Sequence, residues 1–358
     1  MSRLAVAHVD LAALAANHAR LRALAAPARL LAVIKADGYG HGLERVARAL
    51  RGADAFGVAA IADGQRLRAA GHDERIVVLS GPDSAADLSE LRRLSLEAVI
   101  HHDSQLEWLA AERGGAPLRV WLKVDSGMHR LGFAPQRAAA VHARLAAMPH
   151  VHPEIVLMTH FAASDEFANA VTARQIETFA AATRGLPGPR SLSNSAALLG
   201  WPAARGDWVR SGGLLYGLSV VEGTSGADYG MRAALRLSTR LVAINEVAAG
   251  EAIGYAGTWR CPETMPVGVA AIGYGDGYPR SAPSGTPVWL HGREAPLIGR
   301  VSMDLITLDL RQHPEARVGD EVLLWGPQLP AERVAAAAGT LSYVLTCGLT
   351  RRVLFAEA

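Results

Sequence analysis

Lysine is almost absent from this chain, and the two lysines that remain are the first candidates for chemistry. Of the 36 lysine and arginine residues, only Lys35 and Lys123 are lysine. A bias in codon usage explains the excess of arginine, but it does not explain why these two positions keep an amine. An amine can form a Schiff base or a carbamate, whereas the guanidinium of arginine stays charged and cannot. Both lysines are therefore candidates for covalent chemistry.

Lys35 ends a short apolar run and enters a segment rich in glycine. Gly38, Gly40 and Gly42 follow it at alternate positions, and Tyr39 lies among them. Glycine permits a close approach of the backbone to a ligand, and the tyrosine hydroxyl can donate a hydrogen bond. A lone lysine at the end of a strand is usually a solvated surface residue, but this surrounding segment favours a binding site.

Short apolar runs alternate with longer amphipathic runs through the first two-thirds of the chain, a pattern that predicts alternating strands and helices. Apolar residues recur at helical spacing in residues 103–112 and 169–183, for example. Eight strands are predicted, at residues 30–35, 55–60, 75–80, 97–101, 118–124, 154–160, 190–193 and 207–211. The sequence thus predicts an α/β fold that begins with a (β/α)8 TIM-type barrel over residues 1–231.

The pattern changes after Gly230, where shorter apolar runs are broken by glycine and proline. Strands are predicted at residues 266–272, 286–290 and 301–310, with one helix at residues 331–338. Residues 232–358 are therefore predicted to form a second, mainly β domain.

The predicted barrel gives the chemical residues a common position. Ligand chemistry in such barrels gathers at the C-terminal ends of the strands. Lys35, His160 and Arg210 fall at predicted strand ends, and Lys123 lies at or just inside another. We expect these four side chains to surround one point.

A set of motifs in both predicted domains resembles those of the alanine racemase family, in the family's order. The first is the Lys35 segment, which matches an Ala-Val-x-Lys-Ala-x-x-Tyr-Gly-His-Gly pattern. The others are residues 121–132 (WLKVDSGMHRLG), 158–161 (MTHF), 194–196 (NSA), 208–212 (WVRSG), 254–255 (GY), 273–280 (GYGDGYPR) and 299–304 (GRVSMD). One such motif is weak evidence, but the whole set is specific.

The resemblance implies a pyridoxal 5'-phosphate enzyme that interconverts L-alanine and D-alanine with two bases. Lys35 would hold the cofactor as an aldimine and, once released, serve as the base for the D-enantiomer. Tyr255, which matches the family's second base, would serve the L-enantiomer. The conjugated ring of the cofactor accepts the electrons of the carbanion. Considered alone, Tyr255 would be assigned to the core of the β domain.

The resemblance also assigns the remaining site residues. Arg210 would face the pyridine nitrogen and, because it keeps its proton, leave that nitrogen unprotonated and the ring a weaker electron acceptor. His160 would pack on the ring and link Tyr255 to Arg210. The other implied contacts are Tyr39, Ser195, Gly212 and Tyr343 for the phosphate, Arg130 for cofactor and substrate, the Met303 amide for the substrate carboxylate, and Tyr274 and Arg280 for a narrow entrance.

Two further expectations follow from the resemblance. Lys123 matches a lysine that is carbamylated in many family members, where the new anion orients Arg130; its alternative is a buried salt bridge. The family forms head-to-tail homodimers, in which Tyr255 and Met303 of one subunit complete the site around Lys35 of the other. One departure concerns Ser191, which replaces the histidine that some relatives place behind the cofactor arginine, so the outer hydrogen bond of Arg210 is open.

Three other kinds of protein are alternatives to an alanine racemase. A decarboxylase with the same two-domain plan would lack a base like Tyr255 beside an arginine at the ring nitrogen. A broad-specificity racemase of periplasmic type would show an export signal, and none is visible. A non-catalytic carrier of pyridoxal phosphate would resemble the barrel alone. Activity on serine or larger amino acids, and a role in cell-wall synthesis or in alanine breakdown, stay open.

Composition excludes several other classes of partner. A net charge of +2 with 20% charged residues gives no basic surface for nucleic acid or an anionic membrane.

The apolar residues at the N-terminus are interrupted by Asp10, His18 and Arg20 before a signal core or membrane span could form, which predicts a cytoplasmic protein. The two cysteines, Cys261 and Cys347, lie far apart in the sequence and lack the spacing of metal ligands. We therefore expect no disulfide framework and no metal site, and we expect both thiols to be buried.

Overall fold

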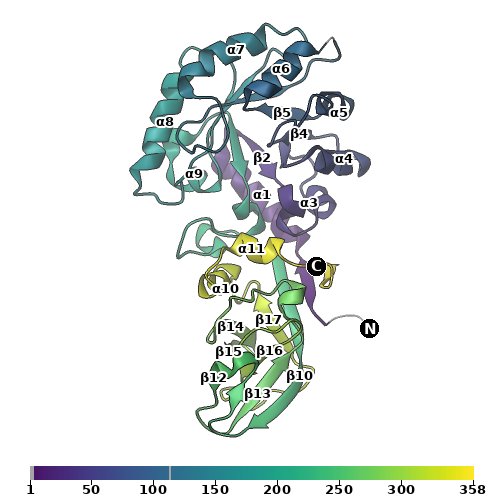
Figure 1. Cartoon of the computed structure of the whole chain (residues 1–358), viewed down its shortest axis with the longest axis vertical. Helices are drawn as coiled ribbons and strands as arrows, with labels where there is room; N and C mark the ends of the chain where they lie inside the picture. Colours follow the sequence, from purple (N-terminus) through teal and green to yellow (C-terminus); the bar gives the residue numbers. More distant parts are fainter. Residues whose placement is uncertain (1–3, 113) are drawn as a thin grey trace.

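The structure is a computed structural model that describes residues 4–112 and 114–358. A barrel of alternating strands and helices forms one end of the elongated molecule, and a β domain forms the other (Figure 1). Helices α10 (Ala331–Ala337) and α11 (Ser342–Cys347) lie between these two parts. The C-terminal ends of the barrel strands carry the residues singled out above.

Eight parallel strands form the barrel, as predicted. They are β2 (Arg29–Val33), β3 (Ala55–Val58), β4 (Arg75–Val78), β5 (Glu97–Ile100), β6 (Val120–Lys123), β7 (Val156–Met158), β8 (Arg190–Ser191) and β9 (Trp208–Ser211). Their order in the sheet is β8-β7-β6-β5-β4-β3-β2-β9. Two backbone hydrogen bonds close it, from Asp207 to Arg190 (2.8 Å) and from Arg210 to Ser193 (2.9 Å). The first predicted strand ends before Lys35, which begins the next helix.

Both faces of the barrel strands are buried, which explains their nearly continuous apolar sequences. One set of side chains fills the interior: Leu31, Val33, Ala55, Val77, Val99, Trp121, Val156, Met158 and Trp208. The alternating set packs against the surrounding helices. At the N-terminal ends of the strands, Glu97 accepts hydrogen bonds from Arg75 and Trp121, which seals that end. The opposite end is left for ligands.

Helix α1 (Leu11–Ala25) precedes the first barrel strand, and further helices connect successive barrel strands. The connecting helices are α2 (Lys35–Tyr39), α3 (Leu43–Ala49), α4 (Ile61–Ala69), α5 (Asp87–Arg93), α6 (Asp103–Ala111), α7 (Ala138–Ala146), α8 (Ala170–Ala182) and α9 (Ser195–Gly200). Helices α6 and α8 confirm the two predicted from apolar spacing. Within the described residues, no helix is long and apolar enough to cross a bilayer.

The second part of the chain is mainly β. Its sheet has the order β13-β16-β15-β14-β17-β10-β1-β18, and a small pair is formed by β11 and β12. The strands are β10 (Leu235–Val247), β11 (Ala252–Ile253), β12 (Trp259–Arg260), β13 (Met265–Ala270), β14 (Pro287–Leu290), β15 (Arg293–Ile298), β16 (Ile306–Asp309), β17 (Glu321–Trp325) and β18 (Leu354–Glu357), with β1 (Val6–Val9) added from the N-terminus. The boundary at residues 231 and 232 stays a prediction.

Several details differ from the sequence predictions. Helix α11 was not predicted, because only one helix was expected after Gly230. Residues 301–305 form a turn rather than the start of a strand, because the Ser302 amide and hydroxyl both donate to the Leu305 carbonyl (3.1 and 2.7 Å). The strand Val6–Val9 was not predicted, although it pairs with β10 and β18. Cys261 is buried as expected, but Cys347 is exposed at the end of α11, so the prediction of two buried thiols was wrong for Cys347.

Candidate active site

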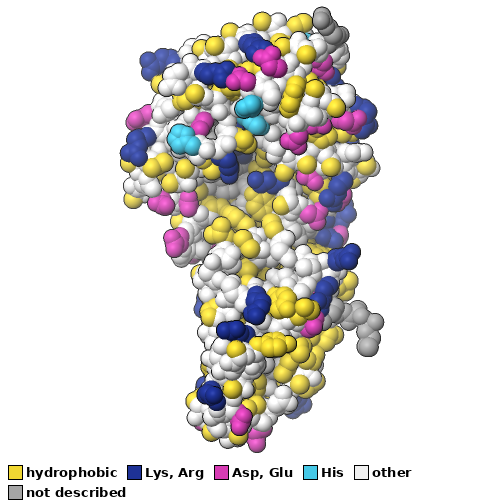
Figure 2. Space-filling view, in the orientation of Figure 1, with side chains coloured by type: hydrophobic (Ala, Val, Ile, Leu, Met, Phe, Trp, Pro, Cys, Tyr) yellow, Lys and Arg dark blue, Asp and Glu magenta, His cyan; other side chains and the backbone are white. Residues whose placement is uncertain are grey.

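A cavity of about 860 Å³ opens at the C-terminal ends of the barrel strands, where α10 and α11 face the barrel. Figure 2 shows this face of the molecule, with Lys or Arg side chains beside a hollow between the barrel helices and the β domain. Nine of the predicted site residues line the cavity: Lys35, Tyr39, Lys123, Arg130, His160, Ser195, Arg210, Gly212 and Tyr343. The structure therefore brings together residues from widely separated parts of the barrel and from α11.

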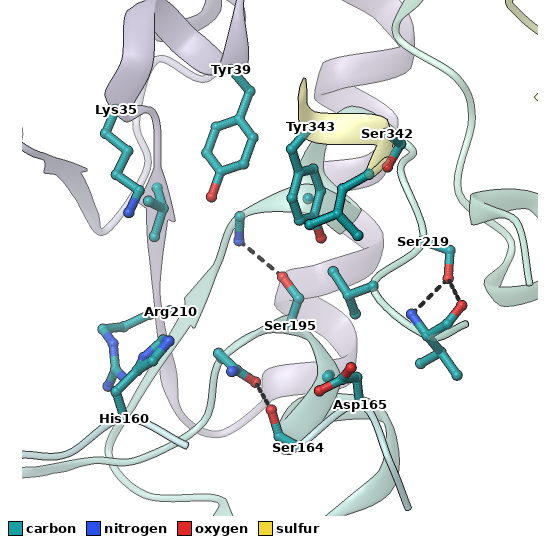
Figure 3. A pocket seen from close by; sticks show the side chains of 18 of the residues that line it. Lys35, Tyr39, His160, Ser164, Asp165, Ser195, Arg210, Ser219, Ser342 and Tyr343 are labelled. Atoms are coloured by element: carbon teal, nitrogen blue, oxygen red, sulfur yellow. Dashed lines mark hydrogen bonds between the residues drawn. The ribbon is translucent and has the colours of Figure 1, made fainter. Parts of the chain in front are cut away.

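Lys35 begins the unusual helix α2, in which Ala36, Asp37 and Gly38 have φ angles of 53°, 52° and 63°. This is a turn of left-handed backbone, which costs about 1–2 kcal/mol for each residue other than glycine. Hydrogen bonds hold it in place, including Gly38 N to Ile34 O (2.9 Å) and Gly42 N to Asp37 O (2.8 Å). Lys35 and Tyr39, at its two ends, both extend into the cavity (Figure 3). Such strain is typical of functional sites.

Four cations share this part of the cavity. Among the described residues, no ion pair involves Lys35, Lys123, Arg130 or Arg210. Burial, and then the charge of Arg130, lowers the pKa of Lys35 below its usual value. Burial, and then the charges of Arg210 and Arg130, lowers the pKa of Lys123 to about 8. The cavity thus favours neutral, nucleophilic amines and anionic ligands.

Arg210 is buried in β9 and is held by backbone carbonyl groups. Its Nη1 donates to the Ser191 carbonyl (2.8 Å) and hydroxyl (2.7 Å), and its Nη2 donates to the Thr159 carbonyl (2.7 Å). Ser191 therefore supplies the outer hydrogen bond that the sequence left open. Within the described part of the protein, this side chain forms its hydrogen bonds through Nη1 and Nη2 only. Its Nε–H is therefore available to donate to a ligand. Burial lowers the pKa of Arg210 to about 10, which keeps the guanidinium charged near neutral pH.

His160 lies beside Arg210, with its Nδ1 3.3 Å from Nη2 of the arginine (Figure 3). Burial, and then the surrounding cations, lowers the pKa of His160 well below its usual value. A neutral ring that is held against an arginine can pack on a flat ligand without adding a further charge to the cavity.

A cluster of hydrogen-bond donors, made of the Gly212 amide and the hydroxyls of Tyr39, Ser195 and Tyr343, lines the same cavity. Ser195 begins α9, where the side chain of Asn194 caps the helix through the Ala197 amide (2.9 Å). The Gly212 amide donates to the Ser195 hydroxyl (2.9 Å). A Cβ at Gly212 would lie 2.4 Å from the Tyr39 hydroxyl oxygen, and a Cβ at Gly213 would lie 2.4 Å from that of Tyr343. Amide and hydroxyl groups that lie this close together can donate hydrogen bonds to the oxygens of a phosphate group.

Arg130 is carried by a loop that follows β6. One carboxylate oxygen of Asp125 accepts hydrogen bonds from the amides of Gly127, Met128 and His129, each at 3.0 Å. The Phe133 amide then donates to the Lys123 carbonyl (2.9 Å), which returns the loop to its strand. The aspartate and this closing contact thus place Arg130 beside Lys123.

The remaining predicted residues do not line this cavity in the single chain. Tyr255 and Met303 are 68% and 51% exposed, and Tyr274 is 38% exposed. Arg280 lies near the Tyr274 ring, with 5.6 Å between its guanidinium carbon and the ring centroid. Tyr255 lies just before β12 in the β domain and is not among the residues that line the cavity around Lys35. Tyr255 therefore cannot meet Lys35 of its own chain in this arrangement.

Two family models match consecutive parts of the chain and together cover most of it. Residues 9–220 match "Alanine racemase, N-terminal domain", and residues 234–356 match "Alanine racemase, C-terminal domain". The chain belongs to the alanine racemase family. Family membership makes it an isomerase and confirms the resemblance drawn from the motifs.

Individual alanine racemases are similar over nearly their whole length. The chain is 49% identical to one from Shewanella baltica over 347 residues, with 97% of each chain covered. It is 49% identical to one from Halorhodospira halophila over 354 residues, with 99% of this chain and 97% of that one covered. The crystal structure of a biosynthetic alanine racemase from Pseudomonas aeruginosa has 44% identity, a TM-score of 0.97 and complete coverage of both chains. The barrel and the β domain are thus shared with the family.

Several polar groups of this racemase-family site were not predicted. The Thr159 carbonyl and Asn194 hold site residues, but the sequence motifs gave them no role. The cavity also extends past the donor cluster to Ser219 and Asp165 (Figure 3), and Glu332 is another of its lining residues. Asn194 could have been found as a helix N-cap before an apolar run. A backbone carbonyl carries no side-chain signal, so the role of Thr159 needed the structure.

Proposed function

We propose that this chain is an alanine racemase that interconverts L-alanine and D-alanine with pyridoxal 5'-phosphate. The observation that carries the proposal is the arrangement inside the cavity. Lys35, the Arg210 guanidinium and the donor cluster of Ser195, Gly212 and the two tyrosine hydroxyls all line this one cavity. A flat aldehyde with a ring nitrogen and a phosphate matches these three features.

The residues present fit that cofactor. The cavity volume of about 860 Å³ leaves room for the cofactor together with a small amino acid. Lys35 would bind the aldehyde carbon, since its lowered pKa favours the neutral amine. The Gly212 amide and the hydroxyls of Tyr39, Ser195 and Tyr343 would bind the phosphate. When bound, the cofactor supplies a conjugated ring that accepts electrons from the substrate Cα.

Arg210 would set how strongly the ring accepts those electrons. Its Nε–H would donate a hydrogen bond to the ring nitrogen without transferring its proton, because the guanidinium stays charged near neutral pH. His160, which contacts the arginine, would pack on the ring as a neutral group. Electron acceptance is then limited, which favours return of a proton to Cα over side reactions such as transamination.

Racemisation needs a proton donor and acceptor on each face of Cα. The Lys35 amine would remove or return the proton on the face used by D-alanine. Tyr255 of the partner subunit would do so on the face used by L-alanine, in a homodimer with two shared sites. The exposure of Tyr255, Tyr274 and Met303 on the β domain supports such an interface, because large apolar side chains are commonly exposed where a partner binds.

Arg130 and the Met303 amide of the partner subunit would bind the substrate carboxylate, and Tyr274 and Arg280 would narrow the entrance so that alanine is preferred.

Lys123 would be carbamylated. The amine has a pKa of about 8 and lies among cations, so conversion to an anion replaces repulsion of Arg130 by attraction.

The function is tested by incubating the purified protein with L-alanine and measuring D-alanine by chiral chromatography, with and without added pyridoxal phosphate. D- and L-forms of serine and lysine serve as comparisons. We expect equal final amounts of the two alanine enantiomers from either starting enantiomer, dependent on the cofactor, and slower turnover of serine and lysine. Release of CO₂ from the substrate in place of racemisation would show a decarboxylase instead.

A further inference from the structure

Arg352, in the C-terminal segment, joins two loops of the β domain. Its Nε lies 3.1 Å from a carboxylate oxygen of Asp276, and its Nη2 forms an ion pair with Asp304. Asp276 belongs to the loop that carries Tyr274, and Asp304 directly follows Met303. A single guanidinium therefore connects the loop of the proposed entrance with the loop of the proposed carboxylate-binding amide.

The same two loops also contact each other through their backbones. The Tyr274 amide donates to the Ser302 carbonyl (3.0 Å), and the Gly275 amide donates to the Met303 carbonyl (2.9 Å). A Cβ at Gly275 would lie 2.3 Å from Nη1 of Arg352 and 3.0 Å from the Met303 carbonyl oxygen. The guanidinium thus packs directly on the backbone that holds Met303.

The C-terminal segment keeps Arg352 in this position. Thr350 donates from its amide to the Asp276 carbonyl (3.1 Å) and from its hydroxyl to the Gly275 carbonyl (2.9 Å). The Arg352 amide donates to the Thr350 hydroxyl (3.3 Å). Asp276 is fully buried, and its other carboxylate oxygen accepts from the Gly273 amide (3.0 Å). Burial of a carboxylate costs free energy unless an opposite charge lies beside it. The buried Asp276 therefore holds the Arg352 guanidinium in place.

We propose that Arg352 is a positioning residue for substrate binding. It touches neither cofactor nor substrate; through Asp304 and Asp276 it fixes the Met303 amide and the Tyr274 ring that face the partner subunit's site. The inference rests on the proposed function, because the roles of Met303 and Tyr274 belong to it. Loss of such a contact weakens substrate binding more than it slows the proton transfers at Lys35, so KM changes more than kcat.

The test is steady-state racemisation by Arg352→Gln, Arg352→Lys and the matched control Arg351→Gln. Arg351 is an exposed neighbour that takes part in no ion pair among the described residues. For Arg352→Gln we expect the KM for L-alanine to rise about 10-fold while kcat changes much less, as for loss of a charged hydrogen bond. Arg352→Lys should recover part of the loss, because one ammonium cannot match the fork of the guanidinium. Arg351→Gln should keep the wild-type KM.

Bound-cofactor absorbance and melting temperature show whether each variant is folded. Asp304→Asn removes one arm of the contact without altering the buried Asp276, and it decides the question if Arg352→Gln does not fold. A raised KM in Asp304→Asn supports the inference, and a wild-type KM in a folded Arg352→Gln or Asp304→Asn overturns it. A wild-type protein that does not racemise alanine would instead refute the proposed function, which separates the two failures.

Discussion

Four basic side chains set the chemistry of the cavity, because no ion pair among the described residues neutralises their positive charge. Lys35, Lys123, Arg130 and Arg210 line one cavity, and burial together with mutual repulsion lowers the pKa of both amines. Each amine is then more often neutral and reactive than a lysine in water. The scarcity of lysine in the sequence made both amines candidates for chemistry, and both line the same cavity.

At the residue scale, the pKa of about 8 for Lys123 gives a prediction for its carbamylation. Only the neutral amine adds to CO₂, so at constant dissolved CO₂ the carbamate should increase as the pH rises through about 8 and disappear well below it. Carbon-13 NMR with labelled CO₂ measures the carbamate directly. Lys123→Arg should abolish the signal and lower racemisation roughly 100-fold, the cost of a misplaced binding group. A signal that persists in Lys123→Arg would assign the carbamate elsewhere.

The sequence predicted the elements of the fold to different degrees. The Gly-rich segment after β2 was predicted to favour a binding site, but its left-handed backbone at Ala36 and Asp37 was not, because alanine rarely adopts a positive φ and a single aspartate does not predict one. The barrel strands were predicted because buried parallel strands have apolar sequences. The strand Val6–Val9 contains His8 and buries only alternate residues, so it lacks the continuous apolar run of the barrel strands; it pairs with β10 on one side and β18 on the other.

At the element scale, the turn at Gly212 should be essential for cofactor binding. A Cβ there would lie 2.4 Å from the Tyr39 hydroxyl oxygen, so Gly212→Ala must displace the tyrosine or the turn. Overpacking of about 1–3 kcal/mol should weaken binding of pyridoxal phosphate roughly 10- to 100-fold. Equilibrium titration followed by cofactor absorbance measures this. Tyr39→Phe removes one hydroxyl without the collision and should cost less; an equal or greater loss in Tyr39→Phe would contradict the steric explanation.

At the scale of the whole molecule, the two bases of the proposed mechanism lie in different parts of the chain. Lys35 lies in the barrel cavity, while Tyr255 is 68% exposed on the β domain and does not line that cavity. The sequence predicted this division through the family resemblance, since no local pattern shows which of two subunits supplies a residue. Two-fold pairing would place each Tyr255 beside the other chain's Lys35 and create two equivalent sites.

The most direct test of this account is complementation between Lys35→Ala and Tyr255→Phe. In a mixed dimer, one site contains both lesions and the other is intact. Each parent alone should be nearly inactive. After mild dissociation and reassociation of equal amounts, about half of the dimers should be mixed, which restores roughly a quarter of wild-type racemisation. Lys35→Ala mixed with Lys123→Ala is the control, because two barrel lesions leave no intact site. Mixed dimers that form and yet remain inactive would contradict a site shared between Lys35 and Tyr255.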